Sequence, residues 1–124
     1  MRRVVVTGLG IVSSIGNDAS EVTESLRQAK SGISFAPDFA EHGFRCQVWG
    51  KPDLDPTDLV DRRAMRFLSQ GGAWNHVAMK QALADSGLEE KDYSENERTG
   101  IIMGSGGPST RTLIEAADIT IKNG

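Results

Sequence analysis

Two runs of apolar residues without polar alternation lie near the two ends of the chain. The first run consists of Val4, Val5, Val6, Leu9, Ile11, Val12 and Ile15, and the second of Ile101, Ile102 and Met103. Runs rich in β-branched residues are typical of strands that are buried on both faces of a sheet. Gly8 and Gly10 interrupt the first run, which indicates that another element packs closely there. We therefore predict a long buried strand over residues 4–15 and a second strand over residues 100–103.

Residues 17–32 show the pattern of an amphipathic helix with a signal at each end. Asp18 stands three residues before Glu21, which is the spacing of a capping box at a helix N-terminus. An apolar stripe then recurs at helical spacing, formed by Val22, Leu26 and Ala29. Gly32 can adopt the left-handed conformation that closes many helices. The pattern predicts a helix that ends at Ser31-Gly32.

Two later segments also repeat apolar residues at helical spacing. A helix over residues 69–86 would have one face formed by Trp74, Val77, Ala78, Gln81 and Ala82. Gly87, which follows directly, can close this helix. Ser109 can cap a third helix, whose stripe is Leu113, Ala117 and Ile121. Because the predicted strands alternate with helices, we expect an α/β architecture with at least partly parallel strand pairing.

The middle of the chain is less regular. Three apolar residues alternate there with polar ones, namely Phe44, Cys46 and Val48. The alternation predicts a short half-buried strand with Cys46 on its apolar face, where a cysteine acts as a small hydrophobic side chain. No adjacent base that would activate this thiol is evident. Farther along, Thr57 or Asp58 can cap a helix that begins near Leu59.

The composition excludes several classes of protein. The 124 residues suffice for one domain and contain 14 Lys and Arg against 17 Asp and Glu, a net charge of -3. Without an excess of positive charge we expect no nucleic-acid partner. No apolar run is long enough for a membrane span or a signal-peptide core, so we expect no membrane association and a cytoplasmic location. One cysteine excludes a disulfide framework, and His42 and His76 lack metal-ligand spacing, so we expect neither a metal site nor a cofactor.

The 14 glycines exceed the usual share of about 7% and gather in two motifs. The segment Thr7–Ser13 is close to a dinucleotide-binding fingerprint, but Ser13 replaces the third glycine and no helix begins directly after it. The segment Gly104–Gly107 lies between a predicted strand and a predicted helix. It is either a simple turn or the wall of a substrate pocket, where free N–H groups can meet a bound oxygen. It lacks the lysine of a phosphate-binding loop.

Three arginines gather on one side of a short predicted helix: Arg62, Arg63 and Arg66. Asp58 and Asp61 are close enough in sequence to pair with some of them, which would make the group a solvated, salt-bridged surface. The alternative is a docking site for an acidic partner or a phosphate group, because a guanidinium binds either through its planar fork. The sequence leaves both interpretations open.

A series of short motifs runs in order along the chain: Arg2–Ser13, Lys30–Ile33, Val48–Gly50, Asp61–Arg63, Arg66-Phe67, Ala82–Leu88 and Gly104–Gly107. Their order and spacing, which cover essentially the whole chain, resemble the β-ketoacyl-acyl-carrier-protein synthases, most closely the bacterial type I enzymes of fatty-acid elongation. The resemblance implies a thiolase-type α/β fold with a mixed, largely parallel sheet and packed helices. Residues 1–124 would then form the N-terminal segment of the N-terminal thiolase-like domain, an incomplete part of that fold.

The resemblance also implies an activity. Enzymes of this family are acyltransferases that elongate an acyl chain by decarboxylative Claisen condensation with malonyl-acyl carrier protein. They use one cysteine, two histidines and a supporting lysine, all beyond the region matched here. We therefore expect no catalytic residue in this chain and no condensing activity from the chain alone. The complete enzyme would be a homodimer.

Five residues match positions with a role in the family. By the resemblance, Arg62, Arg63 and Arg66 dock the acidic acyl carrier protein, and Gly106 and Gly107 belong to a loop beside the acyl pocket. The sibling type II synthases have a bulkier residue at Gly107, so glycine there implies the type I class and a roomier pocket. The helix after Ser109 would lie near the dimer interface. Two other functions stay open, a non-catalytic carrier-docking module and a nucleotide-binding oxidoreductase domain.

Overall fold

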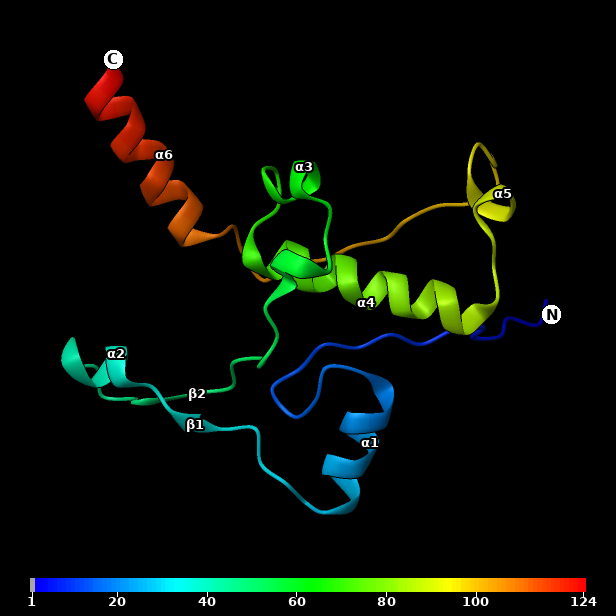
Figure 1. Cartoon of the computed structure of the whole chain (residues 1–124), viewed down its shortest axis with the longest axis horizontal. Coiled ribbons are helices and arrows are strands. Elements are labelled where there is room, and N and C mark those ends of the chain that lie inside the picture. Colours follow the sequence, from blue (N-terminus) through cyan, green and yellow to red (C-terminus); the bar gives the residue numbers. More distant parts are fainter. Residues whose placement is uncertain (1) are drawn as a thin grey trace.

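A computed structural model describes residues 2–124. It contains six α-helices, one 3-10 helix and two short strands (Figure 1). In chain order these are α1 (Ala19–Arg27), β1 (Ser34–Phe35), α2 (Pro37–Glu41), β2 (Val48–Trp49), η1 (Pro56–Asp58), α3 (Arg62–Met65), α4 (Gln70–Ser86), α5 (Glu90–Tyr93) and α6 (Thr110–Asn123). Helix α4 lies in the middle, and the other elements extend from it as separate arms.

Helix α4 has the ends that the sequence predicts. The Ser69 hydroxyl accepts a hydrogen bond from the Gly72 N–H at 3.2 Å, and Gly87 closes the helix in the left-handed conformation with φ +70°. The helix buries Ala73 and Val77 against Val60. Partly buried residues surround this small core: Val12, Leu54, Ala64, Met65 and Leu68. The core thus lies where α4 meets η1 and α3.

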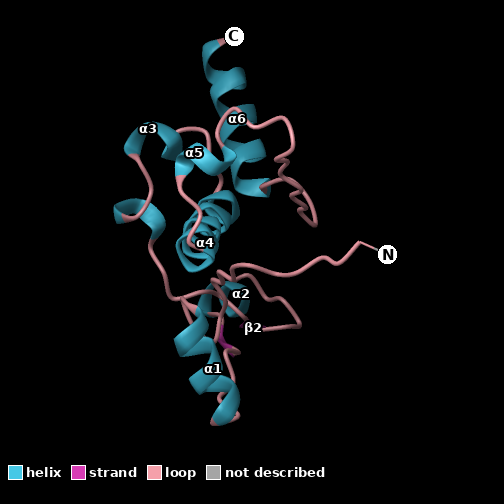
Figure 2. Ribbon diagram, turned by 90° about the vertical axis from the view of Figure 1, so that its right-hand side faces the viewer, coloured by secondary structure: helices cyan, strands magenta, loops and turns pink. Residues whose placement is uncertain are grey.

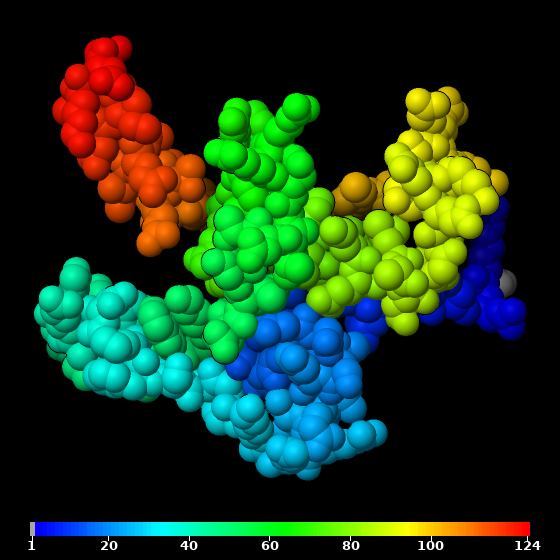
Figure 3. Space-filling view, in the orientation of Figure 1, coloured from blue at the N-terminus to red at the C-terminus, as the bar shows by residue number. Residues whose placement is uncertain are grey.

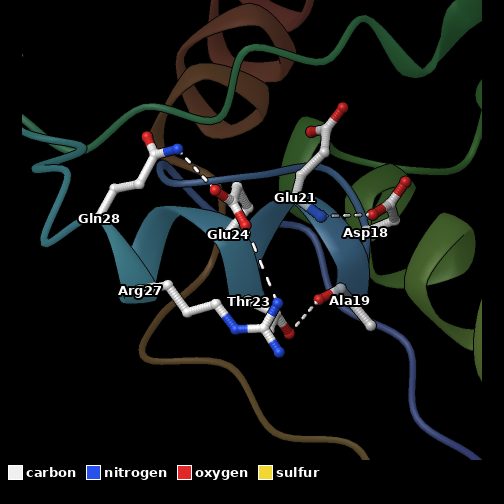
Figure 4. A network of polar contacts seen from close by, with 7 residues as sticks. All are labelled: Asp18, Ala19, Glu21, Thr23, Glu24, Arg27 and Gln28. Atoms are coloured by element: carbon white, nitrogen blue, oxygen red, sulfur yellow. Dashed lines mark hydrogen bonds and ion pairs between the residues drawn. The ribbon is translucent and has the colours of Figure 1, made fainter.

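Helix α1 begins where predicted but ends earlier. The Asp18 carboxylate accepts from the Glu21 N–H at 2.9 Å (Figure 4), and the Glu21 carboxylate accepts from the Asn17 N–H at 2.8 Å. The predicted end at Gly32 is wrong, because the helix stops at Arg27 and the left-handed residue is Ala29, with φ +53°. Gly32 serves a different purpose: a Cβ there would overlap the main chain of Ser14.

We expect Ala29→Gly to stabilise the chain. An L-residue with a side chain is strained in the left-handed region, whereas glycine is not, so the free energy of unfolding should rise by about 0.5–1 kcal/mol. Urea unfolding followed by circular dichroism measures this change. The matched control is Ala84→Gly at an exposed position in the last turn of α4, which should lower the same quantity by up to about 1 kcal/mol. A loss of stability in Ala29→Gly would contradict the expectation.

The strand predicted over residues 4–15 is absent from the described chain. Val4 is 90% exposed and Val6 is 89% exposed, and the segment pairs with no strand; only an isolated bridge joins Ser13 and Gly16. A strand needs a partner for its N–H and C=O groups. This segment instead runs along α4 (Figure 1), where the Leu9 N–H donates to Asp85 at 2.9 Å and the Ile11 N–H donates to Gln81 at 3.0 Å.

The strand predicted over residues 100–103 is also wrong for this structure. These residues lie in a loop (Figure 2), and the Ile102 side chain is fully exposed. Helix α6 follows as predicted, capped by Ser109, but its apolar stripe has no covering element among residues 2–124. The largely parallel sheet that we expected is therefore replaced here by two strands of two residues each, which pair antiparallel with Ser34 opposite Trp49.

The half-buried strand predicted around Phe44–Val48 is shorter than expected. Strand β2 contains Val48 and Trp49, while Phe44 and Cys46 are exposed, so the placement of Cys46 on a buried apolar face is wrong. Aromatic contacts hold this arm instead. The ring of Phe39 meets those of Phe44 and Trp49 edge to face, with centroids 5.4 Å and 5.7 Å apart.

The helix predicted near Leu59 is displaced. The 3-10 helix η1 precedes it, and its cap is Asp55 rather than Thr57 or Asp58. The hydroxyl and N–H groups of Thr57 both donate to the Asp55 carboxylate and hold the pKa of Asp55 below its ordinary value. An α-helix resumes only at Arg62, after Asp61.

Candidate functional site

Helix α3 and the residue that follows it place the three arginines at the surface. The Asp61 carboxylate caps the helix by accepting from the N–H groups of Arg63 at 2.8 Å and Ala64 at 3.3 Å. Ala64 and Met65 are half-buried against the core formed by Val60, Ala73 and Val77. The three arginines, Arg62, Arg63 and Arg66, are exposed. The same short helix thus fixes two apolar side chains inward and leaves its positive charges in solvent.

None of these arginines forms an ion pair within residues 2–124. The ion pairs of this part of the chain are Arg27 with Glu24, at 3.9 Å, and Lys91 with Glu89. Asp61 uses its carboxylate as a helix cap, and Asp58 lies beyond ion-pair distance of the three guanidinium groups. Of the two interpretations that the sequence left open, the salt-bridged surface is therefore not what the structure shows. It shows three exposed arginines that form no ion pair with any residue of the described chain.

The glycine loop lies beside the first turn of α4. Gly106 and Gly107 are exposed, and a Cβ at either position would meet no heavy atom of the described chain within 4 Å. Gly107 lines an open hollow of about 580 Å³, together with Gln70, Gly71 and other residues at the start of α4. Gly106 does not line this hollow. The Ser105 hydroxyl donates to the Gly107 carbonyl at 2.7 Å and shapes the turn.

A second hollow, of about 460 Å³, connects the arginine helix with α6. Its lining includes Arg66 and Phe67 on one side and Pro108, Ser109 and Leu113 on the other. Figure 3 shows α6 standing away from α3 with this open space between them. Pro108 and Ser109 also line the hollow beside Gly107, so the hollow of Arg66 and the hollow of Gly107 adjoin each other near the start of α4. Arg62 and Arg63 line neither hollow.

The dinucleotide interpretation of residues 7–13 does not fit the structure. A Cβ on Gly10 would overlap the Ala78 carbonyl oxygen, and a Cβ on Gly8 would lie 2.8 Å from the Ser86 Cβ. The N–H groups of Leu9 and Ile11, the residues that follow these glycines, already donate to side chains of α4. These glycines therefore let a backbone pack against a helix, as the sequence indicated, and leave no free N–H nest for a pyrophosphate.

The remaining candidates for chemistry lie apart from the arginines. His42 stacks on Phe44 with ring centroids 6.3 Å apart, His76 is exposed on α4, and the Cys46 thiol donates to the Val48 carbonyl at 3.7 Å. In the described part of the chain, no three residues of the metal-ligating types gather closely enough to hold an ion. None of the helices in residues 2–124 has the length and apolar character needed to cross a bilayer.

The sequence analysis did not identify three polar residues that hold the N-terminal segment on α4 or cap α3. Gln81 accepts from the Ile11 N–H and donates to the Asn17 carbonyl at 2.7 Å, so one side chain ties both ends of an extended segment to α4. Asp85, one turn later, accepts from the Leu9 N–H. Asp61 was considered only as a partner for arginine and not as a cap. Its position directly before Arg62-Arg63 was the signal that could have identified it.

Comparisons with known proteins identify the family of this chain. Residues 1–122 match the family described as "Beta-ketoacyl synthase, N-terminal domain". The chain therefore belongs to the β-ketoacyl synthase family, and what it matches is the N-terminal domain of that family. This confirms the resemblance that the ordered motifs indicated.

Within this family, the chain is similar to bacterial synthases named 3-oxoacyl-[acyl-carrier-protein] synthase 1. The chain is 48% identical over 118 residues to 3-oxoacyl-[acyl-carrier-protein] synthase 1 of Escherichia coli strain K12, a match that covers 95% of this chain and 29% of that protein. It is 42% identical over 118 residues to the synthase 1 of Haemophilus influenzae, again over 95% of this chain and 29% of the relative. This chain thus spans about three tenths of the length of these curated relatives.

A solved structure described as the ishigamide ketosynthase/chain length factor is also similar. It is 32% identical in sequence, with a TM-score of 0.64, and the match covers 73% of this chain and 23% of that one. Together with the family, this similarity indicates a thiolase-like fold. Within residues 2–124 that fold is represented by its helices and one small two-stranded sheet.

Proposed function

We propose that this chain forms the N-terminal, carrier-docking part of a β-ketoacyl-acyl-carrier-protein synthase of fatty-acid biosynthesis. The observation that supports this most directly is the capped helix α3 with the residue that follows it, because their three exposed arginines have no ion-pair partner in residues 2–124. An acidic carrier protein provides the carboxylates that such a group binds. The names of the relatives, which are acyl-carrier-protein synthases, agree with that partner.

The proposed reaction is a decarboxylative condensation. An acyl group is first held as a thioester on a cysteine of the enzyme. Malonyl-carrier then loses CO₂, and the resulting carbanion attacks the acyl carbonyl, so that a carbon–carbon bond forms and the cysteine thiolate leaves. The product is a β-ketoacyl-carrier that is two carbons longer. In our proposal the catalytic cysteine and histidines belong to the complete enzyme and not to residues 1–124.

Two further parts of the proposal concern the loop and the assembly. Gly106 and Gly107 form the loop beside the acyl pocket, where the absence of side chains leaves room for the acyl chain. The hollow beside Gly107 supports this role for that residue, and Gly106 follows by its place in the same turn. The complete enzyme is a cytoplasmic homodimer with α6 near its interface. The apolar residues exposed on α6 are consistent with a covering partner there.

The test is a condensation assay on the complete protein whose N-terminal region is this chain. Acyl-carrier and malonyl-carrier are supplied, and the products are separated by mass. We expect release of CO₂ together with a carrier-bound chain two carbons longer, and no product from residues 1–124 alone. A complete protein that binds carrier but forms no product would instead support a non-catalytic docking module. Failure to bind carrier would contradict both functions.

A further inference from the structure

The N-terminal cap of α3 holds the backbone from which the arginines project. Asp61 contacts this helix in three ways. Its carboxylate accepts from the N–H groups of Arg63 and Ala64, and its main-chain carbonyl accepts from the Met65 N–H at 2.9 Å. One residue thus receives hydrogen bonds from three of the four residues of the helix. No other side chain of residues 2–124 caps it.

A helix of four residues does not form on its own. Nucleation fixes several dihedral angles before hydrogen bonds compensate, and isolated helices below about 12–15 residues are marginal in water. Two features therefore keep α3 folded: the Asp61 cap and the packing of Ala64 and Met65 on the core. The packing acts on the second half of the helix. At its first half, where Arg62 and Arg63 lie, the cap is the main restraint.

Asp61 acts on the arginines in two opposite directions. Its negative charge directly precedes Arg62 and Arg63 in the chain and reduces the attraction of this segment for an acidic partner. Its hydrogen bonds, by contrast, keep the backbone that carries Arg62 and Arg63 in one conformation, which lowers the entropy lost when a partner binds these residues. Because the carboxylate bonds to main-chain N–H groups and forms no ion pair with a guanidinium, the two effects can be separated by substitution.

We propose that Asp61 is a positioning residue for carrier docking, which fixes the arginines of α3 through its helix cap. This inference rests on the proposed function of the three arginines. It assigns Asp61 no contact with substrate or with reacting atoms. It makes a specific claim about sign: the loss of the cap weakens docking more than the loss of the negative charge strengthens it.

The experiment compares Asp61→Ala with Asp61→Asn in the complete enzyme. Asparagine caps helices about as well as aspartate but has no charge, whereas alanine removes both properties. For malonyl-carrier we expect Asp61→Ala to raise KM about threefold to fivefold with kcat unchanged, which is about the factor that a lost cap costs a helix end. Asp61→Asn should have a KM equal to or below that of the native enzyme. A small malonyl thioester should be used equally well by all three enzymes.

The control is Asp18→Ala, which removes the same kind of cap and the same charge from α1. It should lower stability without a change in KM. A lowered KM in Asp61→Ala would show that only the charge matters and would overturn the inference. The inference would also fail if Asp61→Ala impaired carrier-linked and small substrates equally. It would fail as well if Asp61→Asn raised the KM as much as Asp61→Ala does. If reversing the charges of Arg62 and Arg66 leaves KM unchanged, the proposed docking function itself fails. If the charge reversal raises the KM but Asp61→Ala leaves it unchanged, the docking function stands and the inference about Asp61 fails.

Discussion

Gly10→Ala is expected to separate the N-terminal segment from α4 and to lower the free energy of unfolding by about 3 kcal/mol. A Cβ at this position would overlap the Ala78 carbonyl oxygen and lie 2.7 Å from the Ala82 nitrogen, and both atoms are helix backbone. A helix backbone cannot rotate aside as a side chain can, so the segment must move away. The hydrogen bond from the Ile11 N–H to Gln81 would then be lost as well.

Urea unfolding measures this loss, and hydrogen exchange at the amides of Leu9 and Ile11 locates it. Both amides should exchange much faster in Gly10→Ala. The matched control is Gly71→Ala, in the first turn of α4 itself, where a Cβ would meet no heavy atom within 4 Å. Alanine is the better helix former, so Gly71→Ala should raise stability by up to about 1 kcal/mol. If Gly10→Ala unfolds at the same urea concentration as the native chain, the close packing is not a determinant of stability.

The elements that the sequence predicted well are those whose signals lie in adjacent residues. The limits of α4 follow from Ser69 and Gly87, and both residues act within one turn of the helix end. The start of α1 follows from Asp18 in the same way. The close packing at Gly8 and Gly10 was also predicted correctly, although the partner element was not, because a missing side chain indicates only that something approaches.

The predictions of strands over residues 4–15 and 100–103 were wrong for a different reason. A run such as Val4-Val5-Val6 indicates that a segment is suited to a sheet, but a strand forms only where another strand accepts its hydrogen bonds. Within residues 2–124 that partner is missing for both long runs, so their backbones lie in loops. Most of their side chains are exposed, whereas Ile11, Val12 and Ile15 are half-buried. The end of α1 failed because Ala29 takes a conformation that its own side chain disfavours.

The structure describes the surroundings of the proposed site residues in more detail than the sequence could. Arg62 and Arg63 begin the short helix α3, Arg66 follows its last residue, and all three are exposed. Their lack of ion pairs could not be derived from the sequence, since Asp61 offers both a counter-charge and a cap. Which role a carboxylate takes depends on the direction of the neighbouring N–H groups, and these are fixed only when the helix is packed on its core.

Reversing two of these charges is expected to affect carrier-linked substrates selectively. In the complete enzyme, Arg62→Glu together with Arg66→Glu should raise the apparent KM for malonyl-carrier on the order of tenfold or more, because attraction to an acidic partner becomes repulsion. The kcat should change little, and a small thioester mimic should be used almost as well as before. Both arginines are exposed and without ion pairs in residues 2–124, so the reversal removes no internal contact of their charged groups.

Ionic strength and a charge-matched control make this expectation specific. Added salt should raise the KM of the native enzyme for malonyl-carrier and should lower the KM of the double variant, because screening weakens attraction and repulsion alike.

The control pair is Arg27→Glu with Arg98→Glu, which changes the net charge by the same amount at exposed positions outside α3. If the control pair raises KM as much as the α3 pair, overall charge explains the effect. If the α3 pair impairs carrier-linked and small substrates equally, these arginines do not dock the carrier.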